Sequence, residues 1–233
     1  MVVNKLVILQ PLFLPWIGVF DMMNQADLFI ILDNVQFSRQ SWQQRNRIKT
    51  QAGVKWLTVP VKHRFGERIM NIKIDYSTDW INKHLKTIHY SYKGAPFFPE
   101  VCELLQRAYA KKPALLCQFN GCLLNDLRDY LGIKTPLILA SDVPIENRGG
   151  KDHVLDLCKY FDAKYYLNGP LGKSLYSPEE FQKIGVDLVF HEFRNPVYSQ
   201  LHGTFISHLS VVDMLFNCGR NTLELVARNN EKD

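Results

Sequence analysis

The feature of this sequence that most constrains its fold is a pair of short apolar segments near the start of the chain. Residues 5–10 (KLVILQ) and 27–33 (DLFIILD) each predict a strand. The second segment is apolar through its centre, which is typical of a parallel sheet covered on both faces. Residues 16–26, between them, carry apolar side chains at helical spacing. Together the three segments predict a right-handed βαβ unit.

The rest of the chain alternates in a similar way, so we expect an α/β fold with a mostly parallel, Rossmann-like sheet. We expect one domain over residues 1–233, with 79–131 as a helical insertion or lid. Residues 38–49 are polar and predict a loop with a helical turn, and 228–233 a frayed end. Further extended segments are expected at 54–62, 69–75, 135–141, 163–169 and 186–193, and helices at 79–91, 99–111, 113–131, 151–161, from 177 and at 205–219.

The loop after the first predicted strand is unusually stiff. Pro11 and Pro15 restrict the backbone on either side, and Gln10 presents an amide that both donates and accepts at a fixed place. Trp16 is expected to form an apolar floor for a polar ligand, or else to pack on the top of the sheet. The glycine-rich G-x-G-x-x-G pattern is absent, so we do not expect a nicotinamide dinucleotide.

Polar side chains follow each predicted strand, and in an open parallel sheet ligands bind beyond the carboxyl ends of the strands. Gln10 follows the first strand, and Asp33 and Gln36 follow the second. The other strand ends carry similar groups, including Asn168 and His191. This convergence predicts a pocket, although strand-end loops are also polar simply because they face water.

Two short motifs indicate phosphate binding. In QQRNRIK (43–49), Arg45 and Arg47 would point the same way from an extended segment, and paired guanidiniums suit a phosphate or diphosphate; from a helix they would diverge. In GPLGKS (169–174), Lys173 follows two glycines separated by two residues instead of the four of a Walker loop. This second motif is a weak nucleotide signal, and a turn with an incidental lysine explains it as well.

The segment HEFRNPVYSQLHG (191–203) offers two candidate general bases, because imidazole titrates near neutral pH. We rank His202 above His191, since the following FISHLSVVD suggests a chain closing over the loop. Either histidine could equally be a hydrogen-bonding surface residue. Asp33 is a third candidate base, and Asp213, in an apolar helical pattern, is either paired in the core or turned toward the site.

Composition limits the possible partners and the compartment. The formal net charge of +5 favours anionic ligands weakly, and the basic residues are scattered, so nucleic acid is not expected except a charged tRNA as a donor. The five cysteines form no C-x-x-C pair or zinc spacing, which indicates a reducing cytoplasm and no metal site. No apolar run approaches the ~18 to 20 residues of a membrane span.

The motifs QP-x3-PW-x-G, D-x-VQ, N-R, WLTVPV and SVVDMLFNCG together resemble the WbqC-like family nearly end to end. Its members are associated with bacterial surface-polysaccharide and O-antigen sugar biosynthesis. The resemblance implies a role in modifying a nucleotide-linked sugar. It also implies that the matched motif residues form the site: Gln10, Pro11, Pro15, Trp16, Asp33, Gln36, Asn46, Arg47, Tyr198 and Gln200.

The opening is also similar to the nucleotidyltransferase-type α/β fold, in which a strand leads to HxGH and a helix. Aligned on Gly18, Trp16 and Val19 replace the two histidines. We therefore expect a transferase that adds an acyl or aminoacyl group to a nucleotide-linked aminosugar, with a histidine or Asp33 as the base. The alternatives are a nucleotidyltransferase of the same fold and a non-catalytic sugar-nucleotide-binding protein. The sequence identifies no cofactor and no donor.

Overall fold

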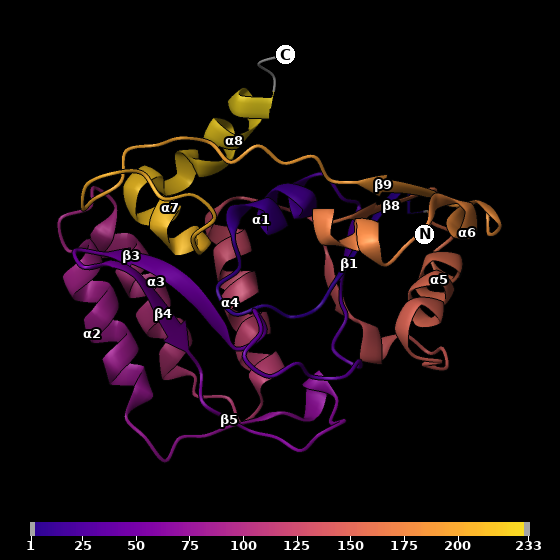
Figure 1. Cartoon of the computed structure of the whole chain (residues 1–233), viewed down its shortest axis with the longest axis horizontal. Coiled ribbons are helices and arrows are strands. Elements are labelled where there is room, and N and C mark those ends of the chain that lie inside the picture. Colours follow the sequence, from indigo (N-terminus) through magenta and orange to yellow (C-terminus); the bar gives the residue numbers. More distant parts are fainter. Residues whose placement is uncertain (1–2, 231–233) are drawn as a thin grey trace.

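The computed structural model describes residues 3–230 and is built around a five-stranded sheet (Figure 1). Every pair of neighbouring strands is parallel, and the strand order is β7-β2-β1-β8-β9. The predicted α/β class with a parallel, Rossmann-like sheet is confirmed. The strands are β1 (Lys5–Leu9), β2 (Leu28–Ile31), β7 (Leu137–Leu139), β8 (Tyr165–Asn168) and β9 (Asp187–Phe190).

Both faces of the central strands β1, β2 and β8 are buried, as the apolar β2 segment predicts. Phe29 and Ile31 of β2 belong to one core cluster together with helix α1 (Ile17–Asn24). Leu28 and Ile30 belong to a second cluster with α5 (Gly150–Tyr160) and α6 (Pro178–Gln182). Alternate side chains therefore face opposite cores, because successive residues of a strand point to opposite faces.

A separate two-stranded antiparallel ribbon corrects two predictions. Residues 38–49 were expected to be a loop, but β3 (Arg45–Thr50) pairs with β4 (Gly53–Thr58), and β4 does not join the main sheet. The predicted 54–62 strand is also interrupted after Thr58, and its end forms β5 (Val61–Lys62), which pairs with β6 (Lys73–Ile74). The sequence of β3 does not show the apolar pattern of a strand, because two of its buried side chains, Asn46 and Lys49, are polar.

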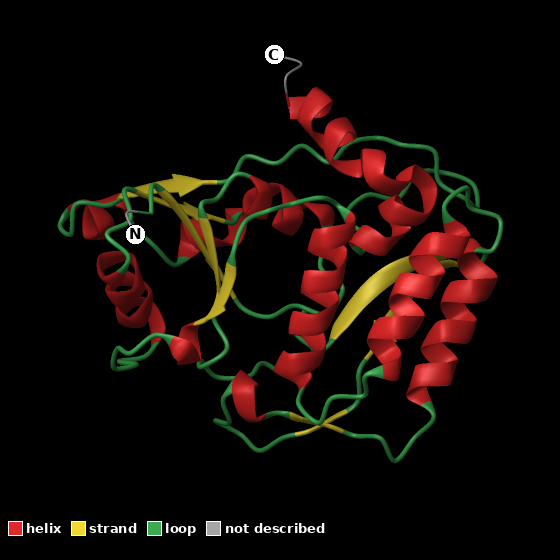
Figure 2. Cartoon of the chain, turned by 180° about the vertical axis from the view of Figure 1, so that it is seen from behind, coloured by secondary structure: helices red, strands yellow, loops and turns green. Residues whose placement is uncertain are grey.

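The remaining helices lie on the opposite side of the central sheet from α5 and α6 (Figures 1 and 2). Helix α7 begins at Val211, later than predicted, where the Ser210 side chain accepts from the backbone of Val212. Residues 228–230 of the predicted frayed end belong to helix α8, and residues 231–233 are outside the described part. The remaining helices are α2 (Trp80–Tyr92), α3 (Phe98–Ala110), α4 (Leu116–Tyr130), α7 (Val211–Cys218) and α8 (Thr222–Asn230). Short 3-10 turns lie at Ile69–Asn71, Ala140–Asp142, Pro170–Ser174 and Gly219–Asn221.

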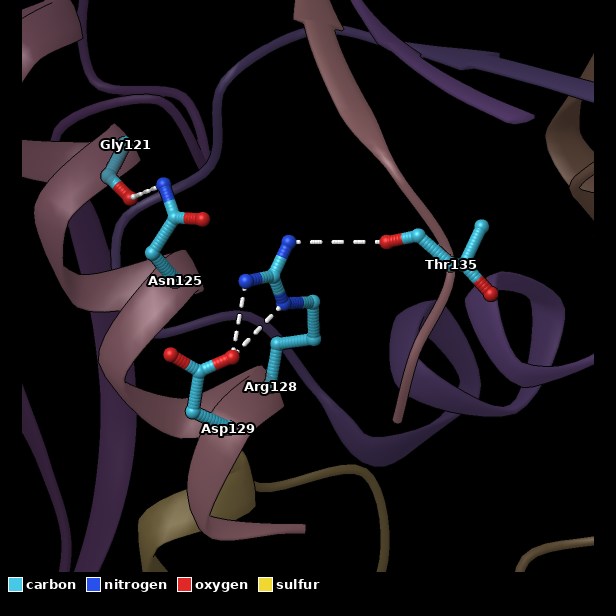
Figure 3. A network of polar contacts seen from close by, with 5 residues as sticks. All are labelled: Gly121, Asn125, Arg128, Asp129 and Thr135. Atoms are coloured by element: carbon cyan, nitrogen blue, oxygen red, sulfur yellow. Dashed lines mark hydrogen bonds and ion pairs between the residues drawn. The ribbon is translucent and has the colours of Figure 1, made fainter. Parts of the chain in front are cut away.

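Arg128 ties helix α4 to the segment that enters β7 (Figure 3). Its Nε and Nη2 donate to Oδ1 of Asp129 at 3.0 and 2.7 Å, and its Nη1 donates to the carbonyl of Thr135 at 3.4 Å. The Thr135 hydroxyl in turn donates to the carbonyl of Met23 at 2.7 Å. These contacts fix the edge strand β7 against α4 and the end of α1.

The order of the strands locates the crevice in which a ligand is expected. From the central β1 the chain moves to β2 and then β7 on one side, and afterwards to β8 and β9 on the other. In open α/β sheets, ligands bind beyond the carboxyl ends of the strands where this direction reverses. That place lies beyond β1 and β8, next to Gln10 and Asn168.

Candidate functional site

The loop after β1 is shaped by the contact between Trp16 and Gly18. A β-carbon at Gly18 would lie only 2.1 Å from the Trp16 ring, so only glycine leaves room for the indole to fold back over the start of α1. The indole also meets Phe193 edge-on, with ring centroids 4.8 Å apart. Trp16 is therefore a fixed, half-buried wall between the start of α1 and the segment after β9.

A buried histidine–carboxylate pair lies directly beyond β9. Nε2 of His191 is 2.6 Å from Oδ2 of Asp21 on α1, and the two side chains are 3% and 10% exposed. The same Asp21 oxygen accepts from the Gln25 side chain at 3.0 Å. Nδ1 of His191 is buried and has no hydrogen-bond partner. In this arrangement the carboxylate orients the ring and leaves Nδ1 as the nitrogen that is able to accept a proton.

Asn168 ends the neighbouring strand β8 and carries a second unpartnered group. Its Nδ2 is buried without an acceptor, and its backbone carbonyl accepts from the His191 backbone at 2.7 Å. The amide packs so closely on Gly172 that a β-carbon there would lie 2.4 Å from Nδ2. Because buried donors in native proteins are nearly always satisfied, this unpartnered amide marks the end of β8 as a candidate polar binding position.

The outer face of the β3–β4 ribbon carries two arginines among two tryptophans. The guanidinium carbon of Arg45 lies 4.5 Å from the Trp56 ring centroid, and that of Arg47 lies 5.6 Å from Trp42 and 5.8 Å from Trp56. Trp42 and Trp56 are 41% and 42% exposed. Neither arginine forms an ion pair within the described chain, residues 3–230. The extended geometry predicted to align Arg45 and Arg47 is present.

The ribbon face and the strand edge are joined by a continuous row of contacts. Nη2 of Arg47 donates to the carbonyl of His208 at 3.1 Å, and the His208 ring lies 6.1 Å from that of Trp16. Trp16 contacts Phe193, whose ring centroid is 5.5 Å from that of His191. We call the set Arg45, Arg47, Trp42, Trp56, Trp16, Phe193, His191, Asp21 and Asn168 the edge site.

Gln10 lies where the loop after β1 meets the segment before β3. Its side-chain oxygen accepts from Nε2 of Gln43 at 2.7 Å, and the backbone of Phe13 donates to the Trp42 carbonyl at 2.9 Å. Gln10 is exposed and keeps its amide nitrogen available to a ligand. These contacts hold the ribbon against the carboxyl end of β1.

Pro11 and Asn46, two further predicted site residues, shape the loop from within. Asn46 is 2% exposed and its Nδ2 donates to the carbonyls of Phe13 and Leu14 at 3.3 and 2.7 Å. The carbonyl of Pro11 accepts from Asn120 on α4 at 3.1 Å. The structure gives both residues a positioning role, because their polar groups are engaged inside the protein.

Asp33 and Gln36 lie beyond β2, on the other side of β1 from His191. Asp33 is 1% exposed, and its two oxygens accept from the backbone and the hydroxyl of Ser141 at 3.0 and 2.7 Å. This contact ties β2 to the turn after β7. Gln36 is exposed beside a cavity of about 300 Å³ that Arg68 also lines. Neither residue joins the contacts of the edge site.

Tyr198 and Gln200 belong to a buried network that fastens the segment 195–208. Asp213 is 1% exposed and accepts from the hydroxyls of Tyr92 at 2.7 Å and Tyr198 at 2.8 Å. Burial raises the pKa of Asp213, while the two tyrosine hydrogen bonds oppose that shift. Nε2 of Gln200 donates to the Tyr198 hydroxyl at 3.1 Å. The sequence left Asp213 either paired in the core or turned toward the site, and the structure shows that it is paired in the core.

The ammonium group of Lys49 completes the attachment of that segment. It donates to Oε1 of Gln200 at 3.1 Å and to the carbonyls of Gly203 and Thr204 at 3.3 and 2.6 Å. His202, preferred from sequence as the base, has a positive φ of 64° and its Nε2 lies 2.6 Å from the Ser91 carbonyl. His202 therefore packs on α2 and lies outside the contacts of the edge site.

Lys173 is exposed in the turn after β8, and its ammonium group lies 5.8 Å from the Phe190 ring centroid. It thus stands near the end of β9, on the same side of β1 as His191. The turn that carries it, Pro170–Ser174, is a 3-10 helix and forms no Walker-type loop.

Two surface cavities lie away from the edge site. One, of about 550 Å³, lies between α4 and β7 and is mainly apolar. Another, about 490 Å³, lies beside Tyr198 and α8. Within residues 3–230, no group of three histidine, cysteine, aspartate or glutamate side chains is placed to hold a metal ion. None of the described helices combines the length and apolar character needed to cross a membrane.

Comparison with known proteins gives a family and one relative. The model of the WbqC-like protein family matches residues 10–225. A protein of Mycobacterium tuberculosis, named Uncharacterized protein Rv1507c, is 34% identical over 220 residues, which cover 93% of this chain and 94% of the relative. No solved structure shows a significant match. The residues matched by the family model, 10–225, include every predicted site residue and the added edge-site residues.

Proposed function

The chain belongs to the WbqC-like protein family, and from this premise and the geometry of the edge site we propose that it modifies a nucleotide-linked aminosugar. The reaction is transfer of an acyl or aminoacyl group onto the sugar's amine, in the cytoplasm, during synthesis of a bacterial surface polysaccharide. The observation that carries the proposal is the row of contacts that links Arg45 and Arg47, which form no ion pair within residues 3–230, to the His191–Asp21 pair.

The arginines supply the anion-binding end of the site. Arg45 and Arg47 project from the same face of β3, and their guanidiniums stack on indole rings. A contact with the ring face orders a guanidinium and leaves its edge toward phosphate oxygens. Since Nε of both arginines is buried and Nη2 of Arg47 donates to the His208 carbonyl, the remaining terminal nitrogens would make that contact. A diphosphate held at these two residues would direct the attached sugar along Trp16 and Phe193 toward His191. Gln10 and Lys173 lie near the same edge and would contact the sugar or its phosphates.

His191 is the group that we assign to remove the proton. The amine nitrogen attacks the carbonyl carbon of an activated ester or thioester, and the bond from that carbon to the leaving atom breaks with its electron pair. The proton lost by the nitrogen passes to Nδ1 of His191. Asp21 stabilises the imidazolium that forms, because its carboxylate faces the other ring nitrogen at 2.6 Å.

One observation favours a second candidate, a protein that binds the sugar nucleotide without transforming it. His191 is 5% exposed, so the substrate must displace part of the Trp16–Phe193 wall to reach its Nδ1. A binding protein needs no such displacement. Nucleotidyl transfer is the weaker alternative, because Trp16 and Val19 stand where that machinery has histidines.

The test is to incubate the purified protein with nucleotide-linked aminosugars and with acyl thioesters or aminoacyl-tRNA, followed by mass spectrometry of the sugar nucleotide. Transfer increases its mass by the acyl or aminoacyl group, and His191→Gln abolishes the increase. If the sugar nucleotide stabilises the protein but no donor is consumed, the binding protein is the correct function. Release of pyrophosphate from a nucleoside triphosphate would instead identify a nucleotidyltransferase.

A further inference from the structure

Two exposed tryptophans, Trp56 on the β3–β4 ribbon and Trp42 before it, order the arginines but contact no ligand in the chemistry described so far. Trp42 and Trp56 are 41% and 42% exposed, and their ring centroids are 5.4 Å apart with an angle of 40° between the rings. Large aromatic side chains stabilise the folded state most when they are buried. Two adjacent exposed indoles therefore leave that stabilisation unused. Adjacent exposed rings mark a surface that a flat ligand can cover.

The strand register places both rings beside the arginines. Trp56 on β4 pairs with Arg47 on β3, and Arg45 lies two residues further along the same face. Trp42 lies three residues before Arg45, the first residue of β3, and contacts Arg47. The surface therefore combines flat aromatic groups with two positive charges that lack ion pairs within the described chain, residues 3–230.

Resting on the proposed function, we propose that Trp42 and Trp56 bind the base of the nucleotide in the sugar nucleotide. A nucleoside diphosphate matches both features of the surface, because its base stacks on aromatic rings and its phosphates meet guanidiniums. The order along the site is then base at the tryptophans, diphosphate at Arg45 and Arg47, and sugar beyond Trp16 toward His191.

The extent of the surface favours a single nucleotide over a nucleic-acid strand. At one end of the ribbon, the segment that contains Gly203 and Thr204 covers Lys49, the next cation along β3. Two rings and two guanidiniums remain, which suffice for one base and its diphosphate. Stacking on an indole also discriminates weakly between bases, so the tryptophans supply affinity more than base identity.

The experiment measures binding of a nucleoside diphosphate, its sugar derivative and the matching sugar 1-phosphate by calorimetry. Trp56→Ala is expected to weaken the first two by roughly 5- to 100-fold, the range expected from loss of base stacking. Binding of the sugar 1-phosphate should weaken less, because it has no base and loses only the ordering of the arginines by Trp56. Trp56→Phe, which keeps a ring, should retain most of the affinity, and Tyr90→Ala, which removes a 69% exposed ring on α2, is the matched control.

The outcomes separate this inference from the proposed function. Unchanged affinity for the nucleotide in Trp56→Ala and Trp42→Ala overturns the inference alone, as does an equal loss for the sugar 1-phosphate. Binding of a single-stranded oligonucleotide more tightly than the sugar nucleotide also overturns it. Nucleotide binding that depends on the tryptophans, without any group transfer, keeps the inference and removes the proposed reaction. No binding of any nucleoside diphosphate by the unmodified protein overturns both.

Discussion

Nε2 of His191 lies 2.6 Å from Oδ2 of Asp21, which joins the carboxyl end of the last strand to the first helix of the chain. The two residues are 170 positions apart in the sequence. Burial of either the imidazole or the carboxylate without its partner would cost free energy, so each residue offsets the cost of burying the other.

Replacing Asp21 by Asn should reduce group transfer on the order of 10² to 10⁴-fold, because the imidazolium formed at His191 loses its counter-charge. Binding of the sugar nucleotide should be nearly unchanged, since Asp21 does not contact the ligand. The measurement is kcat alongside the dissociation constant for the sugar nucleotide. Equal losses in both, or full activity, would remove Asp21 from the role of positioning residue.

Gly18→Ala tests the contact that holds Trp16. A methyl group there would overlap the indole, and overpacking of this kind typically destabilises the folded state by about 1 to 3 kcal/mol. We expect a lower free energy of unfolding and an altered tryptophan fluorescence spectrum. The control is Gly121→Ala on α4, where a β-carbon meets nothing within 4 Å. That change should be neutral or mildly stabilising, and similar losses in both variants would refute the Trp16 packing argument.

Tyr198→Phe tests the buried network around Asp213. Loss of the hydroxyl leaves Oδ2 of Asp213 and the Gln200 amide each without one partner. An unsatisfied buried acceptor costs about 1 to 3 kcal/mol, which denaturant unfolding would detect. Tyr90→Phe, at a 69% exposed ring, should have no effect. If Tyr198→Phe were equally silent while lowering ligand affinity, Tyr198 would be a binding residue instead of a structural one.

His84 should make the protein sensitive to acid. Burial among aromatic side chains lowers the pKa of His84 to about 4, whereas an unfolded histidine titrates near ~6.5. The folded state thus binds fewer protons between these values. The resulting contribution, on the order of 3 kcal/mol, is present above pH ~6.5 and is lost as the pH falls through about 4.

The comparison for this effect is His84→Gln. Its free energy of unfolding should decrease less between pH 6.5 and pH 4 than that of the unmodified protein, whatever its absolute stability. The pH range is set by the two pKa values, so denaturant melts at several pH values within it provide the measurement. Parallel curves for the two proteins would show that another group controls the acid response.

Patterns of apolar residues were sufficient to predict the central sheet. The β1–α1–β2 unit and the strands near β7, β8 and β9 follow from local periodicity, which depends on residues close in sequence. Strand β3 of the ribbon was missed because Asn46 and Lys49 are buried polar residues, whose partners in the 13–14 and 200–204 segments lie far along the chain. The division into one domain, 1–233, with 79–131 as an insertion or lid, stays a prediction.

The candidate site shows the same limit. Arg45, Arg47, Trp16 and His191 were found from their chemistry and motif. Asp21 was missed although a carboxylate within the apolar helix IGVFDMMN was a usable signal, because an unpaired charge there would be costly. Trp42 and Trp56 were missed because a sequence does not reveal which aromatic rings stay exposed when the ribbon pairs.

The central claim is tested most directly by calorimetric titration of nucleotide-linked aminosugars into the unmodified protein, Arg47→Ala and Lys86→Ala. Loss of a guanidinium–phosphate contact should weaken binding by about 1.5 to 3 kcal/mol in Arg47→Ala. Lys86→Ala removes an exposed cation on α2 and should bind as the unmodified protein does. Identical affinities for all three proteins, or no binding by the unmodified one, would contradict the account.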